Sequence, residues 1–225
     1  MLGFTLSKLN LLILVTALFA IISFFMLSLA DIVVSNLAQQ MANDYTTAVQ
    51  GIALGDNICR TSSTTVPESI QYFGGLMPAQ RFYYVLYIKR YPPEGASEGK
   101  PNSLIFQVAS RREKEKIIAT SSLELNATIL LYDWDPVNDT FVEKDTIMVD
   151  PESKGVATKN SVYYVKEIFQ GKKYLHIIAC SSYGGVCERN IDRASCWLKE
   201  CAEIPRESSC FPKPADCASR NVSCG

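Results

Sequence analysis

The sequence predicts an α+β protein with one long N-terminal helix, an antiparallel β-sheet head and a disulfide-rich C-terminal region. Three observations carry this prediction. Residues 9–30 contain no charged side chain, runs of aromatic and β-branched residues follow from Arg81 onward, and seven of the eight cysteines lie between Cys180 and Cys224. The predicted parts are a helix at 4–53, an antiparallel β domain at 54–180 and a cysteine-rich tail at 181–225.

The uncharged segment is long enough to cross a membrane. It has 22 residues, which as a helix span about 33 Å at ~1.5 Å per residue, against a hydrocarbon core of ~30 Å. Lys8 flanks one end and Asp31 the other, so the positive-inside rule keeps the N-terminus in the cytoplasm and exports the rest. Ser28 and Ala30 would also suit a signal-peptidase site, but the apolar run exceeds the ~7–15 residues of a typical signal core.

The pattern after Asp31 predicts that the same helix continues. Apolar residues recur at helical spacing, at Val34, Leu37, Ala38, Met41, Tyr45, Ala48, Val49 and Ile52. No Pro or Gly interrupts residues 4–50, and Gly51 and Gly55 supply stop signals. We therefore expect one helix of about 48 residues and ~70 Å, whose second half packs an apolar stripe against the head.

The start of the chain carries a family resemblance. Gly3-Phe4-Thr5-Leu6, directly before the apolar run, resembles the processing site of type IV pilins and pilin-like proteins. In that family a short leader ends in Gly, the mature chain begins Phe-Thr-Leu, and a long helix precedes a β-sheet head. The resemblance implies a leader at 1–3 and cleavage between Gly3 and Phe4. At the fifth mature position, where many bacterial pilins carry Glu, this chain has Lys8.

The resemblance implies a structural subunit of a cell-surface filament or pseudopilus that assembles with copies of itself. The residues expected to carry assembly are Phe4, Leu6, Lys8, Leu11, Leu14, Leu18, Ile21, Phe25 and Leu29. The alternative is a single-pass, membrane-anchored extracytoplasmic binding or adhesion protein that does not polymerise, in which Lys8 is only a topology signal. Membrane lipid is a partner in both cases, and surface ligands or other pilins are further candidates.

The cysteines predict a disulfide framework on the oxidising side of the membrane. They are Cys59, Cys180, Cys187, Cys196, Cys201, Cys210, Cys217 and Cys224. The absence of any C-x-x-C pair, with His176 as the sole histidine, disfavours structural zinc. Eight cysteines allow about a hundred pairings, so the connectivity stays open. Three glycosylation sequons, at Asn126, Asn138 and Asn221, point to the same exported location.

The exported domain is predicted to hold six or seven antiparallel strands. The candidates are residues 81–88, 104–109, 117–120, 127–134, 140–149, 162–169 and 173–180. Gln170-Gly171-Lys172 marks the clearest hairpin turn, and residues 135–139 mark another turn. Residues 59–67, rich in Ser and Thr, are predicted as a loop or linker. No helix longer than a few turns is expected after residue 58.

No catalytic, cofactor or metal site is predicted, and we expect no enzyme activity. The formal net charge of −1 gives no basic excess for nucleic acid. His176 alternates with apolar neighbours, as an ordinary strand residue does. Residues 133–139 offer acidic oxygens for Ca²⁺ but lack the Gly and distal Glu of an EF-hand loop, so a solvated turn is predicted. The charge run 111–116 is expected to be a solvated face, and residues 82–87 a packed core.

Overall fold

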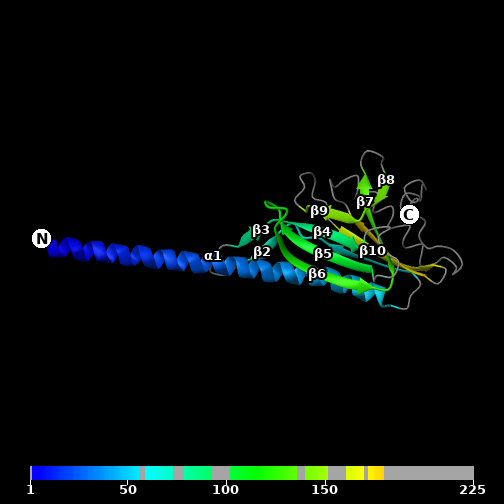
Figure 1. The fold of residues 1–225 in the computed structure, drawn as a ribbon, viewed down its shortest axis with the longest axis horizontal. Coiled ribbons are helices and arrows are strands. Elements are labelled where there is room, and N and C mark those ends of the chain that lie inside the picture. Colours follow the sequence, from blue (N-terminus) through cyan, green and yellow to red (C-terminus); the bar gives the residue numbers. More distant parts are fainter. Residues whose placement is uncertain are drawn as a thin grey trace.

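In the computed structural model, the protein is a long helix that projects from a β-rich head (Figure 1). The structure describes residues 2–55, 59–72, 79–92, 102–135, 140–151, 161–169 and 172–179. The helix, α1, runs from Leu2 to Ala53 without a break, which confirms the prediction of one continuous helix. Gly51 lies within its last turn, and the helix ends before Gly55.

The described part of the head contains eleven strands in three sheets. They are β1 (Cys59–Thr65), β2 (Ile70–Tyr72), β3 (Gln80–Phe82), β4 (Tyr84–Tyr91), β5 (Asn102–Ser110), β6 (Ile117–Leu125), β7 (Thr128–Asp135), β8 (Thr140–Glu143), β9 (Thr146–Val149), β10 (Ser161–Phe169) and β11 (Lys172–Ala179). One sheet has the order β1-β10-β11-β7-β8, the second β6-β5-β4-β9, and β2 pairs with β3. The α+β class is confirmed.

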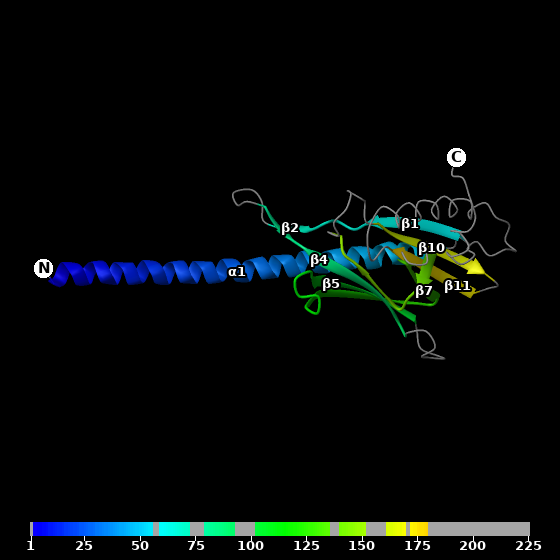
Figure 2. The ribbon, with the colours of Figure 1, turned by 90° about the horizontal axis from the view of Figure 1, so that it is seen from above.

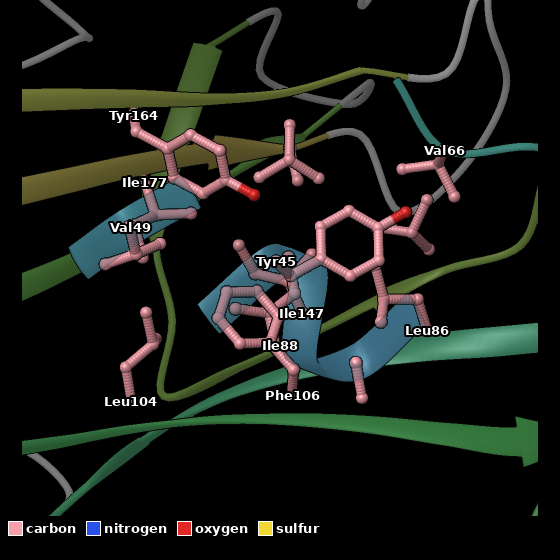
Figure 3. Packing of buried hydrophobic residues seen from close by; sticks show 14 of the residues in the cluster. Tyr45, Val49, Val66, Leu86, Ile88, Leu104, Phe106, Ile147, Tyr164 and Ile177 are labelled. Carbon is pink, nitrogen blue, oxygen red and sulfur yellow. The ribbon is translucent and has the colours of Figure 1, made fainter. Parts of the chain in front are cut away.

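The second half of α1 packs into the core between the two larger sheets (Figures 2 and 3). Tyr45 and Val49 of α1 are buried, with Phe106 of the four-stranded sheet on one side and Tyr164 of the five-stranded sheet on the other. The rings of Tyr45 and Phe106 stack with centroids 5.5 Å apart. One apolar core therefore joins the helix to both sheets.

The end of α1 is held by a buried lysine. Lys166 of β10 is 2% exposed, and its ammonium group donates a hydrogen bond to the carbonyl oxygen of Gly55. A cation near the last carbonyls also complements the negative end of the helix dipole. This contact fixes the helix terminus against the five-stranded sheet.

Residues 59–67 were expected to form a linker, and this prediction is wrong. Residues 59–65 form β1, which pairs antiparallel with β10 along its whole length. β1 is an edge strand, and Ser62 and Ser63 are exposed. An edge strand with a polar outer face is stabilised by backbone hydrogen bonds to its neighbour and does not require alternating apolar side chains. Its Ser/Thr-rich sequence therefore looked like that of a loop.

Residues 140–149 were expected to form one strand, but they form two strands in different sheets. β8 pairs with β7, whereas β9 pairs with β4. The break falls at Lys144 and Asp145, which hydrogen-bond to separate partners: the Lys144 amide to the carbonyl of Leu131, and the Asp145 carbonyl to the amide of Arg90. Similarly, the predicted strand 81–88 divides at Tyr83 into β3 and β4.

The head is not wholly antiparallel. β10 and β11 form the predicted hairpin, with Phe169 opposite Lys172, but β11 also pairs with β7 in parallel. The chain leaves β7, enters the other sheet through β9 and returns as the β10–β11 hairpin, which places β11 beside β7 in the same direction. Two parallel neighbouring strands require such a long crossover connection. No local sequence pattern predicts this pairing.

The side chain of Arg90 joins the two larger sheets. Its Nε donates to Asp145 Oδ1 at 2.7 Å, and its Nη1 donates to Glu143 Oε1 at 2.5 Å and to the Ile129 carbonyl at 3.2 Å. The Arg90 side chain is 8% exposed, so these bonds are shielded from water more than surface ion pairs are.

Arg90→Ala is expected to lower the free energy of unfolding by about 2–3 kcal/mol, because buried charge-assisted hydrogen bonds lose their donor. Urea unfolding followed by circular dichroism measures the change. Arg112→Ala, at an exposed arginine, is the matched control and should change stability by less than about 0.5 kcal/mol. Equal losses in the two variants would contradict a linking role for Arg90.

Candidate functional site

The first half of α1 presents an exposed apolar surface over most of its length. Figure 1 shows this half projecting away from the sheets. The described assembly residues predicted from the sequence are all exposed, at Leu11 63%, Leu14 59%, Leu18 50%, Ile21 53%, Phe25 62% and Leu29 50%. Such a continuous exposed apolar surface is typical of a segment that contacts lipid or another chain.

The apolar surface changes to a one-sided stripe within one turn of Asp31. Beyond that residue the buried positions of α1 are Val34, Ala38, Ala42, Tyr45, Val49 and Ile52. Their spacing of three or four places them on one face, while Gln40, Asn43 and Asp44 are exposed on the other. The helix is therefore divided near residue 31 into a projecting half and a docked half.

By length and composition, α1 can cross a membrane. The same properties fit a signal sequence, since the apolar window lies near the N-terminus. Tyr45 and Val49, which belong to the core of the head, lie beyond this window, so cleavage before Asp31 would leave them in the folded domain.

Several predicted site residues lie outside the described part of the structure. The backbone of Gly3, Phe4 and Leu6 belongs to α1, but their side chains are not described. Lys8 is exposed. The backbone of Cys59 starts β1, while its side chain, Cys180 and the six cysteines of the tail lie outside the described residues, as do Asn138 and Asn221. The predicted disulfides therefore stay predictions. Asn126 is exposed in the turn between β6 and β7, a position open to modification.

His176 lies in the sheet as an ordinary strand residue would. It is 3% exposed on β11, and its ring lies 6.0 Å from that of Tyr132 and 6.3 Å from that of Tyr174, centroid to centroid. The two tyrosine rings lie nearly parallel to the imidazole. This aromatic packing accounts for its burial.

Asp133 begins the segment that was expected to be a solvated turn, but its side chain is buried in the structure. Asp133 is 1% exposed and accepts a hydrogen bond from Lys144 Nζ at 2.6 Å, so the expectation is wrong for this residue. Asp145 instead pairs with Arg90. The carboxylates of Asp133 and Asp145 therefore pair with different side chains, Lys144 and Arg90. Within the described ranges, no three His, Cys, Asp or Glu side chains come together as a metal site would require.

The charge run 111–116 is mostly exposed, and the structure shows where it lies relative to α1. Arg112 to Lys116 are exposed, whereas Arg111 is partly buried and its Nε lies 3.1 Å from Asp150 Oδ2. This β5–β6 loop lies beside α1 near Asp31, and Lys116 and Ile117 line a pocket there. The sequence identified the charge run, but five separate elements (α1, β2, β3, β5 and β6) form the pocket, and no local signal brings them together.

Tyr84 and Tyr164 are fully buried in the core. Tyr84 donates its hydroxyl proton to the carbonyl of Pro67 at 2.5 Å, and Tyr164 lies on β10 facing α1. Burial raises the pKa of both phenols well above the ordinary 10.0. A buried phenolate would lose its hydration, which is the physical cause of the shift.

The head is therefore expected to lose stability in alkali. Above pH ~10 the unfolded chain releases these phenolic protons while the folded chain keeps them, so stability is full below pH ~10 and falls as pH rises toward the folded pKa values. Each buried phenol contributes a slope of about 1.4 kcal/mol per pH unit. Urea midpoints measured across this range should fall less steeply in Tyr84→Phe and Tyr164→Phe. Tyr91→Phe, at a side chain 51% exposed, should leave the slope unchanged.

Comparison of this chain with protein-family models, with curated proteins and with solved structures yields no match.

Proposed function

We propose that this protein is a pilin-like structural subunit of a cell-surface filament or pseudopilus, assembled through the projecting half of α1. The observation that supports the proposal most is the continuity of α1 from Leu2 to Ala53, apolar and exposed first and docked in a β head afterwards. A subunit that moves from lipid into a filament needs one helix that suits both surroundings.

The physical cause of assembly would be the burial of apolar side chains. In the bilayer, side chains such as Phe19 and Phe25 lie among lipid tails, where helices gain little from hydrophobic contact with one another. Once the helix leaves lipid, these side chains, 69% and 62% exposed, must be covered by other copies. The head and the tail would then form the outer surface.

The alternative is a monomeric membrane anchor with an extracytoplasmic binding head. It uses the same helix but requires no contact between copies. The exposed apolar half of α1 supports both proposals equally, since lipid alone can cover it. The GFTL start favours the first proposal, and Lys8 is compatible with the second as a topology signal.

The deciding measurement is the intact mass and N-terminal residue of the protein from its native membrane. A chain that begins at Phe4, especially with an N-methylated amine, supports prepilin-type processing. A chain that keeps Met1 favours the plain anchor. A start at Asp31 contradicts both proposals and leaves a secreted soluble domain.

Contact between copies is tested by a photo-crosslinking amino acid at Phe19. The filament subunit should give a ladder of oligomers, because neighbouring helices surround this position. The matched control carries the crosslinker at Asn43, which is exposed on the docked half of the same helix. Crosslinks from Phe19 to lipid alone would contradict filament assembly.

A further inference from the structure

A pocket of about 330 Å³ lies where α1 emerges from the head. Ala30 and Asp31 of α1 form one wall, Tyr72 of β2 and Phe82 of β3 another, and Lys116 and Ile117 at the start of β6 a third. Figures 1 and 2 show β2 and the β5–β6 loop at the end of the head that faces the projecting half of the helix. We call this end the base of the head, defined by these six residues and loop 111–116.

The position of the base relative to a bilayer follows from the helix. Ala30 is the last residue of the uncharged segment and also lines the pocket. If residues 9–30 span the hydrocarbon core, Asp31 and the pocket lie at the depth of the lipid headgroups. This step rests on the proposed membrane position of α1.

The base combines cations with exposed apolar side chains. Arg112, Lys114 and Lys116 are exposed, and within the described residues none of their side chains forms an ion pair. The acidic side chains of the same surface are Glu113, Glu115 and Asp31. Ile117 is 47% exposed directly beside Lys116. Basic and acidic side chains alternate along residues 112–116, and the basic ones, next to the exposed Ile117, are the groups that a membrane interface attracts.

The β5–β6 loop is held in one shape before any ligand arrives. The Lys116 amide donates to the Glu113 carbonyl at 2.8 Å, and the Ser110 amide donates to the Lys116 carbonyl at 3.0 Å. The Arg111 amide donates to the carbonyl of Tyr83 at 3.2 Å, which ties the loop to the junction between β3 and β4. These bonds fix the backbone of the loop, so binding of a ligand would order the Lys116 side chain rather than the loop backbone.

We propose that the base of the head binds phospholipid headgroups, with a lipid phosphodiester at Lys116 and the adjoining glycerol and acyl carbons against Ile117 and Ala30. Arg112 and Lys114 extend the attraction to neighbouring phosphates. Bound lipid seats the head on the membrane surface, so the head keeps one orientation while the subunit stays in the bilayer.

The test uses amide hydrogen exchange of the full chain in lipid nanodiscs and in uncharged maltoside micelles. Nanodiscs of phosphatidylcholine with phosphatidylglycerol should slow exchange in residues 111–117 relative to micelles. Lys116→Glu should weaken this protection, since loss of one basic side chain near an anionic surface lowers the binding constant about fivefold and the new carboxylate lowers it further. Lys173→Glu is the control, because Lys173 is an exposed lysine lining a different pocket, beside Leu54 and Glu124, and the change in net charge is the same.

Unchanged exchange in β4 and β5 shows that Lys116→Glu is folded. Equal exchange of residues 111–117 in micelles and nanodiscs overturns lipid binding and leaves the membrane anchor intact. Protection that appears in micelles at high protein concentration points to a second copy at the base and also overturns it. A chain that does not enter nanodiscs at all overturns the anchor itself, and with it this inference.

Discussion

The double substitution Val15→Arg and Phe19→Arg is expected to release the protein from the membrane. The two side chains are 45% and 69% exposed and lie one turn apart near the middle of the apolar segment. Each arginine at the centre of a spanning helix costs about 2.5–3.5 kcal/mol of insertion free energy. The pair should shift most of the protein from the membrane pellet to the soluble or aggregated fraction after alkaline carbonate extraction.

The matched control places the same residues at the same spacing on the docked half of α1. Gln40→Arg with Asp44→Arg alters two exposed positions on the polar face, and this variant should stay in the pellet. If the Val15 and Phe19 variant also stays, the projecting half of α1 is not what holds the protein in the membrane. Release of both variants would indicate a general effect of added charge.

Tyr45→Ala is expected to cost the head about 3–5 kcal/mol, the largest loss of stability foreseen for a single side chain. Tyr45 is 1% exposed, stacks on Phe106 and lies among residues from both sheets, so its removal leaves a cavity where the three layers meet. A small domain has only about 5–15 kcal/mol in total. Urea unfolding of the full chain in detergent, followed by near-ultraviolet circular dichroism, measures the loss.

Two further variants separate ring packing from other effects. Tyr45→Phe keeps the ring and should retain most of the stability, since the contact with Phe106 remains. Asp44→Ala, one residue away on the exposed face, should stay within about 0.5 kcal/mol of the unmodified protein. If Tyr45→Ala were as mild as Asp44→Ala, the docked half of α1 would not be part of the cooperative core.

The parts of the fold that depend on local patterns could be predicted from the sequence. The stripe from Val34 to Ile52 is set by the helical repeat, and it is buried. The β10–β11 hairpin is set by two strand-like runs around Gln170-Gly171, and it forms with the expected strands. In both cases the residues that determine the structure are neighbours in the chain.

The parts that depend on distant partners could not be predicted. β1 looks like a linker because its pairing is provided by β10, not by its own side chains. Residues 140–149 look like one strand, but the chain breaks at Lys144 and Asp145. Arg90 binds Glu143 at the end of β8 and Asp145 within the break. The pocket beside Ala30 is likewise assembled from five elements. Tertiary contacts override local preference at each of these positions.

The pairing of β1 with β10 sets the order in which the chain can fold during synthesis. Cys59 lies opposite Glu167, so the two strands are about a hundred residues apart in the chain. At a ribosomal rate of roughly 5–20 residues per second, β1 waits about 5–20 s for its partner. Throughout that time the apolar stripe of α1 lacks the five-stranded sheet that will cover it. Part of the stripe therefore stays uncovered until β10 and β11 have been made.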